Sequence, residues 1–362
     1  MVRRFTWVTL MSAALVLAAC GSDSSPNASY DGGLDAAAAD AAAADAAAPD
    51  AAAPEAAPAD AARDGGGPPV LPEDLPEPLP TGAPSAAFIT YNVGLAPTVK
   101  GSAQRLPLIV DAVNAADADV LCLEEVWKVY TSQAAFAQAV AATFPYAFWS
   151  EDTTKAMGTG VLIVSKHPLF KGRALKYVAN PETYFDNVVL GVDVVTPTSH
   201  FRVLCTHLAP GLDSVGVGDR SAQITELATW AQTQGYLDGP TVLLGDFNMG
   251  PDPIQACTPT TTPACTAPDV TSYDLVRQTF TDANEGWAQC TWCRDICNPL
   301  QVSSLFLDEP DQRIDHCFVT NLGAATLQSR AVVFDAVQRI PFGSGTLEHL
   351  SDHLGVRCAF GP

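Results

Sequence analysis

Short apolar runs bounded by turn-forming residues recur along the chain from residue 87 to the C-terminus. The runs are rich in Val, Ile, Leu and Phe, and many end in a polar residue, a pattern typical of buried β-strands. Residues 241–244, for example, read Thr-Val-Leu-Leu and are followed by Gly-Asp-Phe-Asn. We expect strands over residues 87–93, 119–125, 159–165, 188–195, 201–207, 241–244, 313–319, 331–334 and 354–360.

Three other segments carry apolar residues at helical spacing, over residues 103–114, 132–143 and 219–234. Helices interspersed among many strands favour an α/β sandwich with mixed sheets over a regularly wound parallel sheet. No further linker-like stretch follows residue 86. The pattern therefore predicts one folded domain over residues 87–362.

Residues 1–20 have the pattern of an export signal. Two arginines precede an apolar run over residues 8–17, which is too short to span a membrane as a helix. The signal ends in Leu-Ala-Ala-Cys, which resembles a bacterial lipobox and implies that Cys20 is the lipidated first residue of the mature protein. An ordinary cleaved signal is the alternative. Gly21 is not the Asp associated with inner-membrane retention in enteric bacteria, so we expect an exported lipoprotein at the outer membrane or cell surface.

Residues 21–86 consist mainly of Ala, Asp, Pro and Gly, with a loose Asp-Ala-Ala-Ala-Ala repeat. The segment contains 12 acids and one base, which give a net charge of −11. This composition offers little to bury and predicts a disordered, extended or weakly helical linker. We interpret it as a spacer that holds the domain away from a membrane, and an inert leader is the alternative.

The remaining body is also acidic, with a net charge of −12 out of −21 for the whole chain. Proteins that bind duplex DNA tightly present a basic surface to its phosphates. The negative net charge argues against tight nucleic-acid binding, although a local cationic groove can coexist with a negative total charge. One local basic cluster is present, and a solvated face is its simplest interpretation. Its members are Lys155, Lys166, Lys171, Arg173 and Lys176.

Nine cysteines follow Cys20, and an exported chain meets an oxidising environment. Cys257 and Cys265 flank a Thr/Pro-rich loop and are expected to pair. Three more cysteines cluster at positions 290, 293 and 297. Disulfides are favoured there over zinc, because a closed zinc site needs four ligands and no fourth is evident.

The other four cysteines lie inside predicted strands. Cys122 and Cys205 are surrounded by apolar residues, and we expect them to be buried free thiols. Cys317 and Cys358 fall on two late strands and could pair across them.

The segment Leu243–Asn248 carries the strongest chemical signal. A buried strand runs into Gly245, where the backbone can turn, and then presents a carboxylate and a carboxamide two residues apart. Because strand side chains alternate, we expect Asp246 and Asn248 on one face and Phe247 on the other. A carboxylate binds positive charge and a carboxamide donates hydrogen bonds, so the pair suits a phosphate and its metal.

Polar residues end several other predicted strands, which would place them on one rim of a sandwich. Each has a simpler explanation on its own: Asn92 can be a turn former, and His207 a core or surface histidine. Glu125 can be a solvated charge, and Asp315 an ion-pair partner of Arg313. Their joint presence and their order favour a functional site. The full set is Asn92, Glu125, His207, Asp246, Asn248, Asp315, Asp352 and His353.

Seven segments in this order resemble the endonuclease/exonuclease/phosphatase superfamily, which includes pancreatic deoxyribonuclease, abasic-site endonucleases, inositol polyphosphate 5-phosphatases and neutral sphingomyelinases. The resemblance spans Phe88 to the C-terminus. It implies an α+β fold, a deoxyribonuclease-like four-layer α/β sandwich of two packed mixed sheets flanked by helices. The segments are Thr-Tyr-Asn-Val (90–93), Leu-Glu-Glu-Val (123–126), Gly-Val-Leu-Ile-Val-Ser-Lys-His-Pro-Leu (160–169), Thr-His-Leu (206–208), Gly-Asp-Phe-Asn (245–248), Arg-Ile-Asp-His (313–316) and Ser-Asp-His (351–353).

The resemblance implies a site for a divalent ion, Mg²⁺ first, with Mn²⁺ or another divalent ion as alternatives. Glu125 would be its principal ligand, with Asn92 nearby in direct or indirect contact. Asp352 would complete the metal shell or hold a second ion. Hard ions of this kind prefer oxygen ligands and retain several waters, which fits so sparse a set of protein ligands.

The resemblance also implies catalytic roles for five residues in an in-line attack of water on a phosphoester. His353 would be the general base or an electrostatic partner of the attacking water, oriented by Asp315 through its other ring nitrogen. Asp246 would orient or deprotonate that water. Asn248 and His207 would donate hydrogen bonds to the phosphoryl oxygens.

Three positions depart from the family pattern. Glu124 stands where the family usually has Gln, and a second carboxylate there could raise metal affinity or shift the pKa of its neighbour. Gly94 replaces an Asp of some nuclease members, which weakens both a two-ion site and an abasic-endonuclease interpretation. His316 replaces the commoner Tyr, and we expect it to be an ordinary strand residue.

The segment 282–315 resembles the sphingomyelinase-type branch, since Asn-Pro-Leu at 298–300 precedes Arg-Ile-Asp. So does the predicted helix with Arg220, Gln223, Glu226 and Leu227. Together with a membrane anchor and an acidic body, this favours a metal-dependent phosphodiesterase that acts on a phospholipid or sphingolipid head group. We expect a monomer attached to a membrane through Cys20. An extracellular nuclease is the alternative, and a catalytically inactive surface lipoprotein is less favoured because every expected catalytic position is filled.

Overall fold

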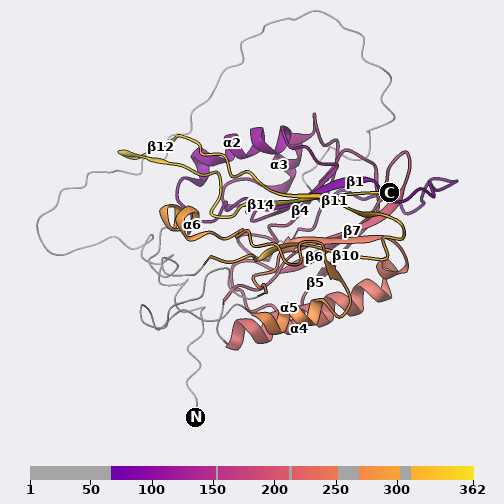
Figure 1. Ribbon diagram of the computed structural model, residues 1–362. Coiled ribbons are helices and arrows are strands. Elements are labelled where there is room, and N and C mark those ends of the chain that lie inside the picture. Colours follow the sequence, from indigo (N-terminus) through magenta and orange to yellow (C-terminus); the bar gives the residue numbers. More distant parts are fainter. Residues whose placement is uncertain (1–66, 152–153, 212–213, 252–268, 302–310) are drawn as a thin grey trace, which may run out of the picture. The chain divides into compact units, whose positions relative to one another are not determined.

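Two β-sheets lie face to face in the part of the chain that the structure describes, and helices cover their outer faces (Figure 1). The structure is a computed structural model, and it describes residues 67–151, 154–211, 214–251, 269–301 and 311–362. In order across the first six-stranded sheet, the strands are β11 (Thr326–Val333), β14 (Gly355–Gly361), β1 (Ala86–Asn92), β2 (Val120–Glu124), β4 (Leu162–Ser165) and β3 (Tyr146–Trp149).

The second sheet is also six-stranded. Both sheets are mixed: β1 and β2 run parallel in the first sheet, and a single parallel pair occurs in the second. In order across the second sheet, the strands are β5 (Leu169–Lys176), β6 (Val188–Val195), β7 (His200–His207), β8 (Thr241–Asp246), β10 (Asp315–Thr320) and β9 (Thr281–Asp282), of which β7 and β8 are parallel.

Three apolar cores separate four layers of structure. The first core lies between one sheet and its helices, the second between the two sheets, and the third between the other sheet and its helices. This is the sandwich that the sequence predicts. The helices are α2 (Ser102–Asn114) and α3 (Gln133–Val140) on the first sheet, α4 (Ser214–Thr233) and α5 (Val270–Val276) on the second, and α6 (Arg294–Leu300) near one end; η1 (Tyr236–Asp238) is a short 3-10 turn.

Strand β1 shows why the central strands read as continuous apolar runs. Ile89 and Tyr91 pack toward the helices, whereas Phe88 packs between the sheets. Successive side chains of a strand point to opposite faces, and both faces of β1 are buried. All seven of its residues are accordingly buried, so no polar face interrupts the pattern.

The sequence predicts the central elements to within a few residues, and residues 188–195 are matched at both ends. The predicted strand 159–165 begins later, at Leu162. Gly160 has a left-handed backbone (φ 67°), which interrupts the extended chain before the strand starts, and a Cβ there would meet the Trp127 ring at 2.4 Å. Elements that the sequence does not predict are β3, β5, α5, β9, α6 and a separate two-stranded hairpin of β12 (Ile340–Phe342) and β13 (Gly345–Leu347).

Strand β5 is missed because it lies at the edge of its sheet and carries charges. Lys171, Arg173 and Lys176, part of the basic cluster, all lie on this strand. Its register shifts at a bulge between Phe170 and Arg173. Charged residues and bulges protect sheet edges against further pairing, so this strand lacks an apolar run.

The linker prediction for residues 21–86 is wrong for the part that the structure describes. Leu71 packs against the core between the sheets, and the Lys171 amide donates to the Pro72 carbonyl at 2.9 Å. Arg173 donates to both carboxylate oxygens of Glu73, at 2.7 and 2.5 Å. Acidic and Pro-rich composition predicted little buried surface, but Leu71, the backbone bonds at Pro72 and Gly82 and the ion pair of Glu73 connect this segment to the domain.

The free-thiol prediction for Cys122 and Cys205 and the possible pairing of Cys317 with Cys358 also need correction. Cys122 and Cys205 form a disulfide that links β2 in one sheet to β7 in the other. The sequence shows that both are buried but not that their strands face each other. Cys317 and Cys358 remain free, buried thiols, although they lie close together.

The disulfide preference for the 290–297 cluster is confirmed, because Cys290 bonds to Cys293. Cys20, Cys257 and Cys265 lie outside the described residues. Within the described ranges, no helix combines the length and the apolar character needed to cross a membrane.

Candidate functional site

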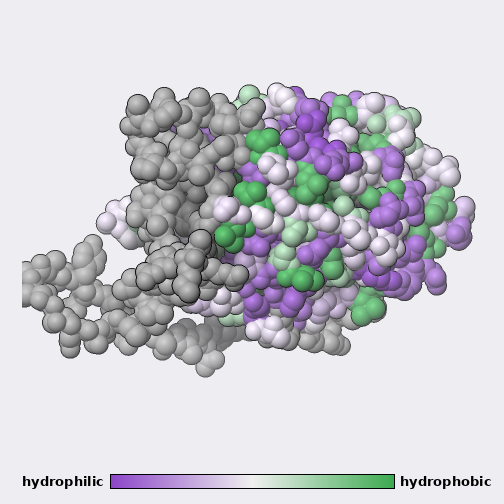
Figure 2. All heavy atoms as spheres, turned by 90° about the horizontal axis from the view of Figure 1, so that it is seen from below, coloured by the Kyte–Doolittle hydropathy of each residue, from purple (hydrophilic) through white to green (hydrophobic). Residues whose placement is uncertain are grey.

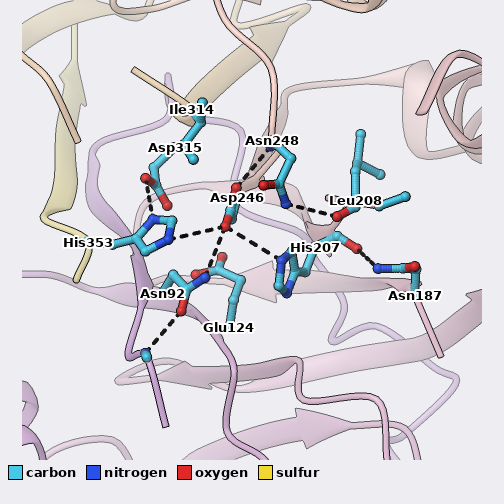
Figure 3. A network of polar contacts seen from close by, with 12 residues as sticks. Asn92, Glu124, Asn187, His207, Leu208, Asp246, Asn248, Ile314, Asp315 and His353 are labelled. Atoms are coloured by element: carbon cyan, nitrogen blue, oxygen red, sulfur yellow. Dashed lines mark hydrogen bonds and ion pairs between the residues drawn. The ribbon is translucent and has the colours of Figure 1, made fainter. Parts of the chain in front are cut away.

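Strand ends from both sheets meet at one rim of the sandwich (Figure 3). Asn92 ends β1 beside Glu124, which ends the parallel strand β2. In the other sheet, His207 and Asp246 end the parallel strands β7 and β8 as neighbours. Asp315 joins them because it begins β10, which runs antiparallel to β8. The topology thus assembles polar side chains that are far apart in the sequence.

Asp246 lies at the centre of this arrangement. Its Oδ2 accepts from Asn92 Nδ2 at 2.9 Å, and its Oδ1 accepts from the backbone amide of Asn248 at 2.9 Å. His207 Nε2 and His353 Nε2 lie 3.5 and 3.8 Å from Oδ2. Burial, and after it the charge of Asp315, raises the pKa of Asp246 to about 6.

His353 lies between two carboxylates. Its Nδ1 is 3.0 Å from Asp315 Oδ2, which holds the ring, and its Nε2 faces Asp246. Burial lowers the pKa of His353, but the charges of Asp315 and Asp246 outweigh burial, so its pKa stands well above the usual value. The charged form of the ring is therefore favoured. Arg313, the alternative partner of Asp315, instead pairs with Asp282 at 2.8 Å.

His207 and Asn248 line the other side of Asp246. Burial lowers the pKa of His207, and its Nδ1 is buried without a hydrogen-bond partner. Asn248 lies beyond the end of β8 with a left-handed backbone (φ 50°), so strand alternation does not set its direction. Its Nδ2 donates to the Leu208 carbonyl at 3.0 Å, which fixes the amide beside His207.

Gly245 is required by close packing at this point. A Cβ at residue 245 would lie 2.1 Å from the Thr206 carbonyl oxygen on the neighbouring strand. Strands β7 and β8 can therefore bring His207 and Asp246 together only with glycine here. This refines the sequence interpretation, in which Gly245 served to turn the chain.

The three expected metal ligands, Asn92, Glu125 and Asp352, lie close together. The Oδ1 of Asn92 accepts from the Gly94 amide at 3.0 Å and keeps a second lone pair. Glu125 has a left-handed backbone (φ 60°) after the end of β2. Burial, and then the charge of Asp352, raises the pKa of Glu125, with hydrogen bonding by Asn92 acting in the opposite direction.

These residues fit a hard divalent cation. The charge of Asp352 disfavours ionisation of Glu125, and a divalent cation between these two carboxylates and the amide oxygen of Asn92 would remove that repulsion. Gln301 Nε2 donates to Asp352 Oδ2 at 2.6 Å and aims that carboxylate. A side chain at Gly94 would meet Asp352 Oδ1 at 2.3 Å, so an Asp at this position is incompatible with the present placement of Asp352.

A second cluster of ligand-type atoms lies next to these residues. Among the described residues, ligand atoms of Asp246, Asp315 and His353 lie within 4.8 Å of one another and could also bind a divalent metal. Cys122, Glu124 and Cys205 satisfy the same distance criterion, but the two sulfurs are bonded to each other.

Glu124 is fully buried beneath the site. Its Oε1 accepts from Thr90 Oγ1 at 2.7 Å, whereas Oε2 has no partner. Burial, and then the charge of Asp315, raises the pKa of Glu124 well above the usual value. A protonated Glu offers the same neutral shape and donor as the Gln that the family pattern has at this position.

Sequence reasoning missed Arg105, which braces the loops that carry Asn92 and Asp352. Arg105 is fully buried and donates to the carbonyls of Gly94 and Leu350, both at 2.5 Å. It also donates to the Lys100 carbonyl at 2.9 Å. An arginine on the buried face of a predicted helix was the available signal, because such a residue needs acceptors inside the protein.

His316 is an ordinary strand residue, as predicted. It lies on β10, is fully buried, and its Nε2 is 2.9 Å from the Met249 carbonyl oxygen.

Comparisons with known proteins agree with this arrangement of strands. Residues 89–353 match the model of the Endonuclease/Exonuclease/phosphatase family. None of the curated protein sequences matches the chain.

Three solved structures illustrate the similarity of the fold. Beta toxin from Staphylococcus aureus, determined with bound magnesium ions, is 16% identical with a TM-score of 0.57, over 76% of this chain and 99% of that chain. Sphingomyelinase C from Streptomyces griseocarneus is 18% identical with a TM-score of 0.54, over 76% and 99%. A mannosyl-6-phosphatase from Bacteroides thetaiotaomicron is 16% identical with a TM-score of 0.53, over 77% and 100%.

These identities show a shared fold, and the family match covers most of the chain. The two packed mixed sheets, the ordered motifs at their rim and the match over residues 89–353 lead to one conclusion. The chain belongs to the endonuclease/exonuclease/phosphatase family.

Proposed function

We propose that the protein is a divalent-metal-dependent phosphodiesterase that hydrolyses a phosphoester by in-line attack of water. One observation carries the proposal: the buried Asp246 carboxylate is surrounded by Asn92, Asn248, His207 and His353 at the rim where two sheets meet. Asp246 can accept a proton, and the surrounding amides and imidazoles can donate hydrogen bonds to a phosphoryl group as its negative charge grows. The family hydrolyses phosphoesters, which supports the reaction class.

Asp246 aims the attacking water and takes its proton in this proposal. Its two oxygens are fixed by Asn92 and Asn248, so the carboxylate cannot rotate away from the rim. His353, held by Asp315, lies between two carboxylates that favour its charged form. It therefore serves as the electrostatic partner of the phosphoryl group better than as the resting general base.

His207 and Asn248 are placed to donate hydrogen bonds to phosphoryl oxygens as negative charge develops there. A neutral His207 ring protonated at Nε2, which lies 3.5 Å from Asp246 Oδ2, would turn this single N–H from Asp246 to a phosphoryl oxygen, and Asn248 has a second amide proton beyond the one given to Leu208. A divalent ion bound by Glu125, Asp352 and Asn92, with Mg²⁺ the first candidate, would neutralise the charge of the phosphate.

A lipid head group is the substrate class that we favour. The β12–β13 hairpin precedes Ser351-Asp352-His353 in the chain and exposes Phe342 at 38%, while Val337 just before it is 67% exposed. Leu347 anchors the hairpin in the core that Leu350 shares. A short hairpin with exposed apolar side chains, close in the chain to Asp352 and His353, would suit contact with a lipid surface. The face over α4 and α5 instead mixes hydrophilic and apolar residues (Figure 2).

An extracellular nuclease remains the second candidate, and the basic cluster is the feature that would support it. Acidic partners pair with most of this cluster and offset part of its charge. Lys155 and Lys176 both pair with Asp186, and Lys171 pairs with Asp193. The paired charges offer little attraction to a phosphate backbone, so lipid stays favoured.

Attachment and location complete the proposal. We propose an exported monomer, anchored at an outer membrane or cell surface through a lipid on Cys20, which lies outside the described residues. The acidic segment after Cys20 would allow the domain to reach the membrane in which its substrate lies.

A substrate panel at one fixed Mg²⁺ concentration tests the proposal. Sphingomyelin, phosphatidylcholine, phosphoinositides, supercoiled plasmid and bis-p-nitrophenyl phosphate are compared with wild type, His353→Ala and Asp246→Asn. We expect lipid turnover that a chelator abolishes and that each substitution lowers about 10²-fold or more. Plasmid nicking without lipid turnover would replace the lipid assignment by the nuclease one. Activity that survives both the chelator and His353→Ala would refute the mechanism.

A further inference from the structure

A four-residue disulfide loop lies against the Asp315–His353 pair. Cys290 and Cys293 are bonded, with their Cα atoms 5.4 Å apart. The two residues that they enclose, Thr291 and Trp292, are both buried, with exposures of 0% and 8%. This loop lies on no strand.

The loop is bonded to the segment that carries Asp315. The Thr291 hydroxyl accepts from the backbone amides of Ile314 and Asp315, both at 3.1 Å. The amides of Thr291 and Trp292 donate to the Gln312 carbonyl at 2.8 and 3.0 Å, and the Gln312 amide donates back to Trp292 at 2.8 Å. Five hydrogen bonds therefore connect this short loop to residues 312–315.

The same loop contacts the segment that carries His353. The Leu354 amide donates to the Thr291 carbonyl at 2.8 Å. The Trp292 ring meets the His353 ring edge to face, with centroids 4.8 Å apart and an interplanar angle of 71°. Through Thr291 and Trp292, the loop holds both members of the pair, which are 38 residues apart in sequence.

We propose that the Cys290–Cys293 loop is a positioning element for His353, and that catalysis depends on the oxidised state of this disulfide. The inference rests on the proposed function of the site. The bond closes the loop, the closed loop fixes the Thr291 hydroxyl and the Trp292 ring, and these fix Asp315 and His353. Small displacements of reacting groups can lower rates up to 100-fold.

Opening the bond requires an external dithiol. The dithiol transfers two electrons to the sulfur–sulfur bond and closes to its own disulfide, while its two protons end on the Cys290 and Cys293 thiols. Cys290 is partly exposed, whereas Cys122 and Cys205 are both fully buried. A mild reductant should therefore reach the loop before the disulfide between the sheets.

Two matched variants of Thr291 provide the first test. Thr291→Val keeps the shape but removes the hydroxyl, which leaves the amides of Ile314 and Asp315 unsatisfied. Thr291→Ser keeps the hydroxyl. We expect Thr291→Val to lower kcat on bis-p-nitrophenyl phosphate about 10- to 100-fold with little change in KM. Thr291→Ser should keep most of the wild-type kcat.

The redox arm compares wild type with Cys290→Ser/Cys293→Ser, with and without dithiothreitol, and identifies the opened bond by thiol alkylation and mass spectrometry. We expect dithiothreitol to lower the kcat of wild type to that of the double variant and to leave the double variant unchanged. Equal kcat for wild type and the double variant, or for Thr291→Val and Thr291→Ser, would overturn the inference.

Failure of the proposed function gives a different result. A wild-type protein that hydrolyses none of the panel refutes the function itself. The positioning role is then read from the ring nitrogen NMR signals of His353. These signals should move in Thr291→Val and stay in place in Thr291→Ser, and unmoved signals in both would overturn the inference without reference to activity.

Discussion

Asn92 donates a hydrogen bond to Asp246 at 2.9 Å, and this bond joins the last residue of β1 in one sheet to the last residue of β8 in the other. The proposed metal ligands lie at the ends of strands of the first sheet or in the loop before β14, and the proposed proton acceptor ends a strand of the second. A shift of one sheet against the other would therefore separate the two halves of the site.

Asn92→Ala should lower catalysis and metal affinity together. The substitution frees Asp246 Oδ2, so we expect kcat to fall about 10- to 100-fold. It also removes the oxygen that Asn92 would offer to the metal ion, so we expect half-saturation of the site to need more Mg²⁺. The measurement is hydrolysis of bis-p-nitrophenyl phosphate across a Mg²⁺ titration. A variant that loses affinity for Mg²⁺ but recovers full kcat at saturation would show that the bond to Asp246 has no positioning role.

In the metal-free protein, Glu124→Gln should become more stable relative to wild type as the pH rises. The pKa of Glu124 is raised on folding, so above pH ~4.5 the unfolded chain has lost a proton that the folded protein keeps. The free energy of unfolding of wild type then falls by up to about 1.4 kcal/mol per pH unit until the raised pKa is reached. The variant does not lose this stability, because Gln does not titrate. Urea unfolding in EDTA at pH 5 and pH 8 measures the difference.

The exposed Glu348 provides the control for this comparison. Glu348→Gln should follow the wild-type curve at both pH values. If Glu124→Gln also ran parallel to wild type, the buried carboxyl would have to be ionised in the folded protein.

Arg105→Met should destabilise the fold and weaken metal binding. The change leaves the carbonyls of Gly94, Lys100 and Leu350 without their donor, and each buried unsatisfied group costs about 1–3 kcal/mol. We expect a loss of roughly 3 kcal/mol or more in urea unfolding. The exposed Arg330→Met serves as the matched control. Equal unfolding free energies for the two variants would contradict the bracing role.

Asp282→Asn should destabilise the protein at neutral pH, and the cost should shrink progressively as the pH falls below ~4. Burial opposes ionisation of Asp282, yet His316 and Arg313 outweigh it and hold its pKa below the usual value. A depressed pKa gives stability that is present above pH ~4 and lost as the pH falls further. Breaking this buried pair should cost about 3–5 kcal/mol at pH 7. Unfolding at pH 7 and pH 3 tests this, and an equal cost at both would refute it.

Phe342→Ser should separate lipid turnover from soluble-substrate turnover. Moving a half-exposed Phe into a lipid surface is worth roughly 1 kcal/mol, so we expect about a fivefold loss on sphingomyelin vesicles and none on bis-p-nitrophenyl phosphate. Val178→Ser, which changes a residue that is 90% exposed, is the control. If both variants lost equal activity on vesicles, the hairpin would have no specific role in lipid contact.

The sequence predicts much of the central fold because the inner strands are buried on both faces. Residues such as Ile89 and Phe88 are equally apolar although they face different cores, so the runs are unmistakable. Edge strand β5 and the small β12–β13 hairpin leave most of their residues partly or fully exposed and lack this signal. Local patterns also cannot show that Leu71 and Glu73 bind back to the domain.

Motif order names the residues of the candidate site, whereas their partners depend on tertiary contacts. Asp246 and His353 stand in recognisable motifs. Two of the supporting residues belong to no such pattern. Gln301 donates a hydrogen bond to the Asp352 carboxylate, and the Thr291 hydroxyl accepts one from the Asp315 amide. Their roles arise from loops that meet only after the sheets have packed.

The Cys122–Cys205 disulfide makes the stability of this fold depend on the redox conditions around the protein. It closes a loop of 83 residues, and a cross-link of that span removes about 4.5 kcal/mol of chain entropy from the unfolded state. Single domains have net stabilities of only about 5–15 kcal/mol. A copy of the chain folded in a reducing cytosol would lack this cross-link and would unfold far more readily. Formation of this disulfide would therefore supply a large share of the net stability of the domain.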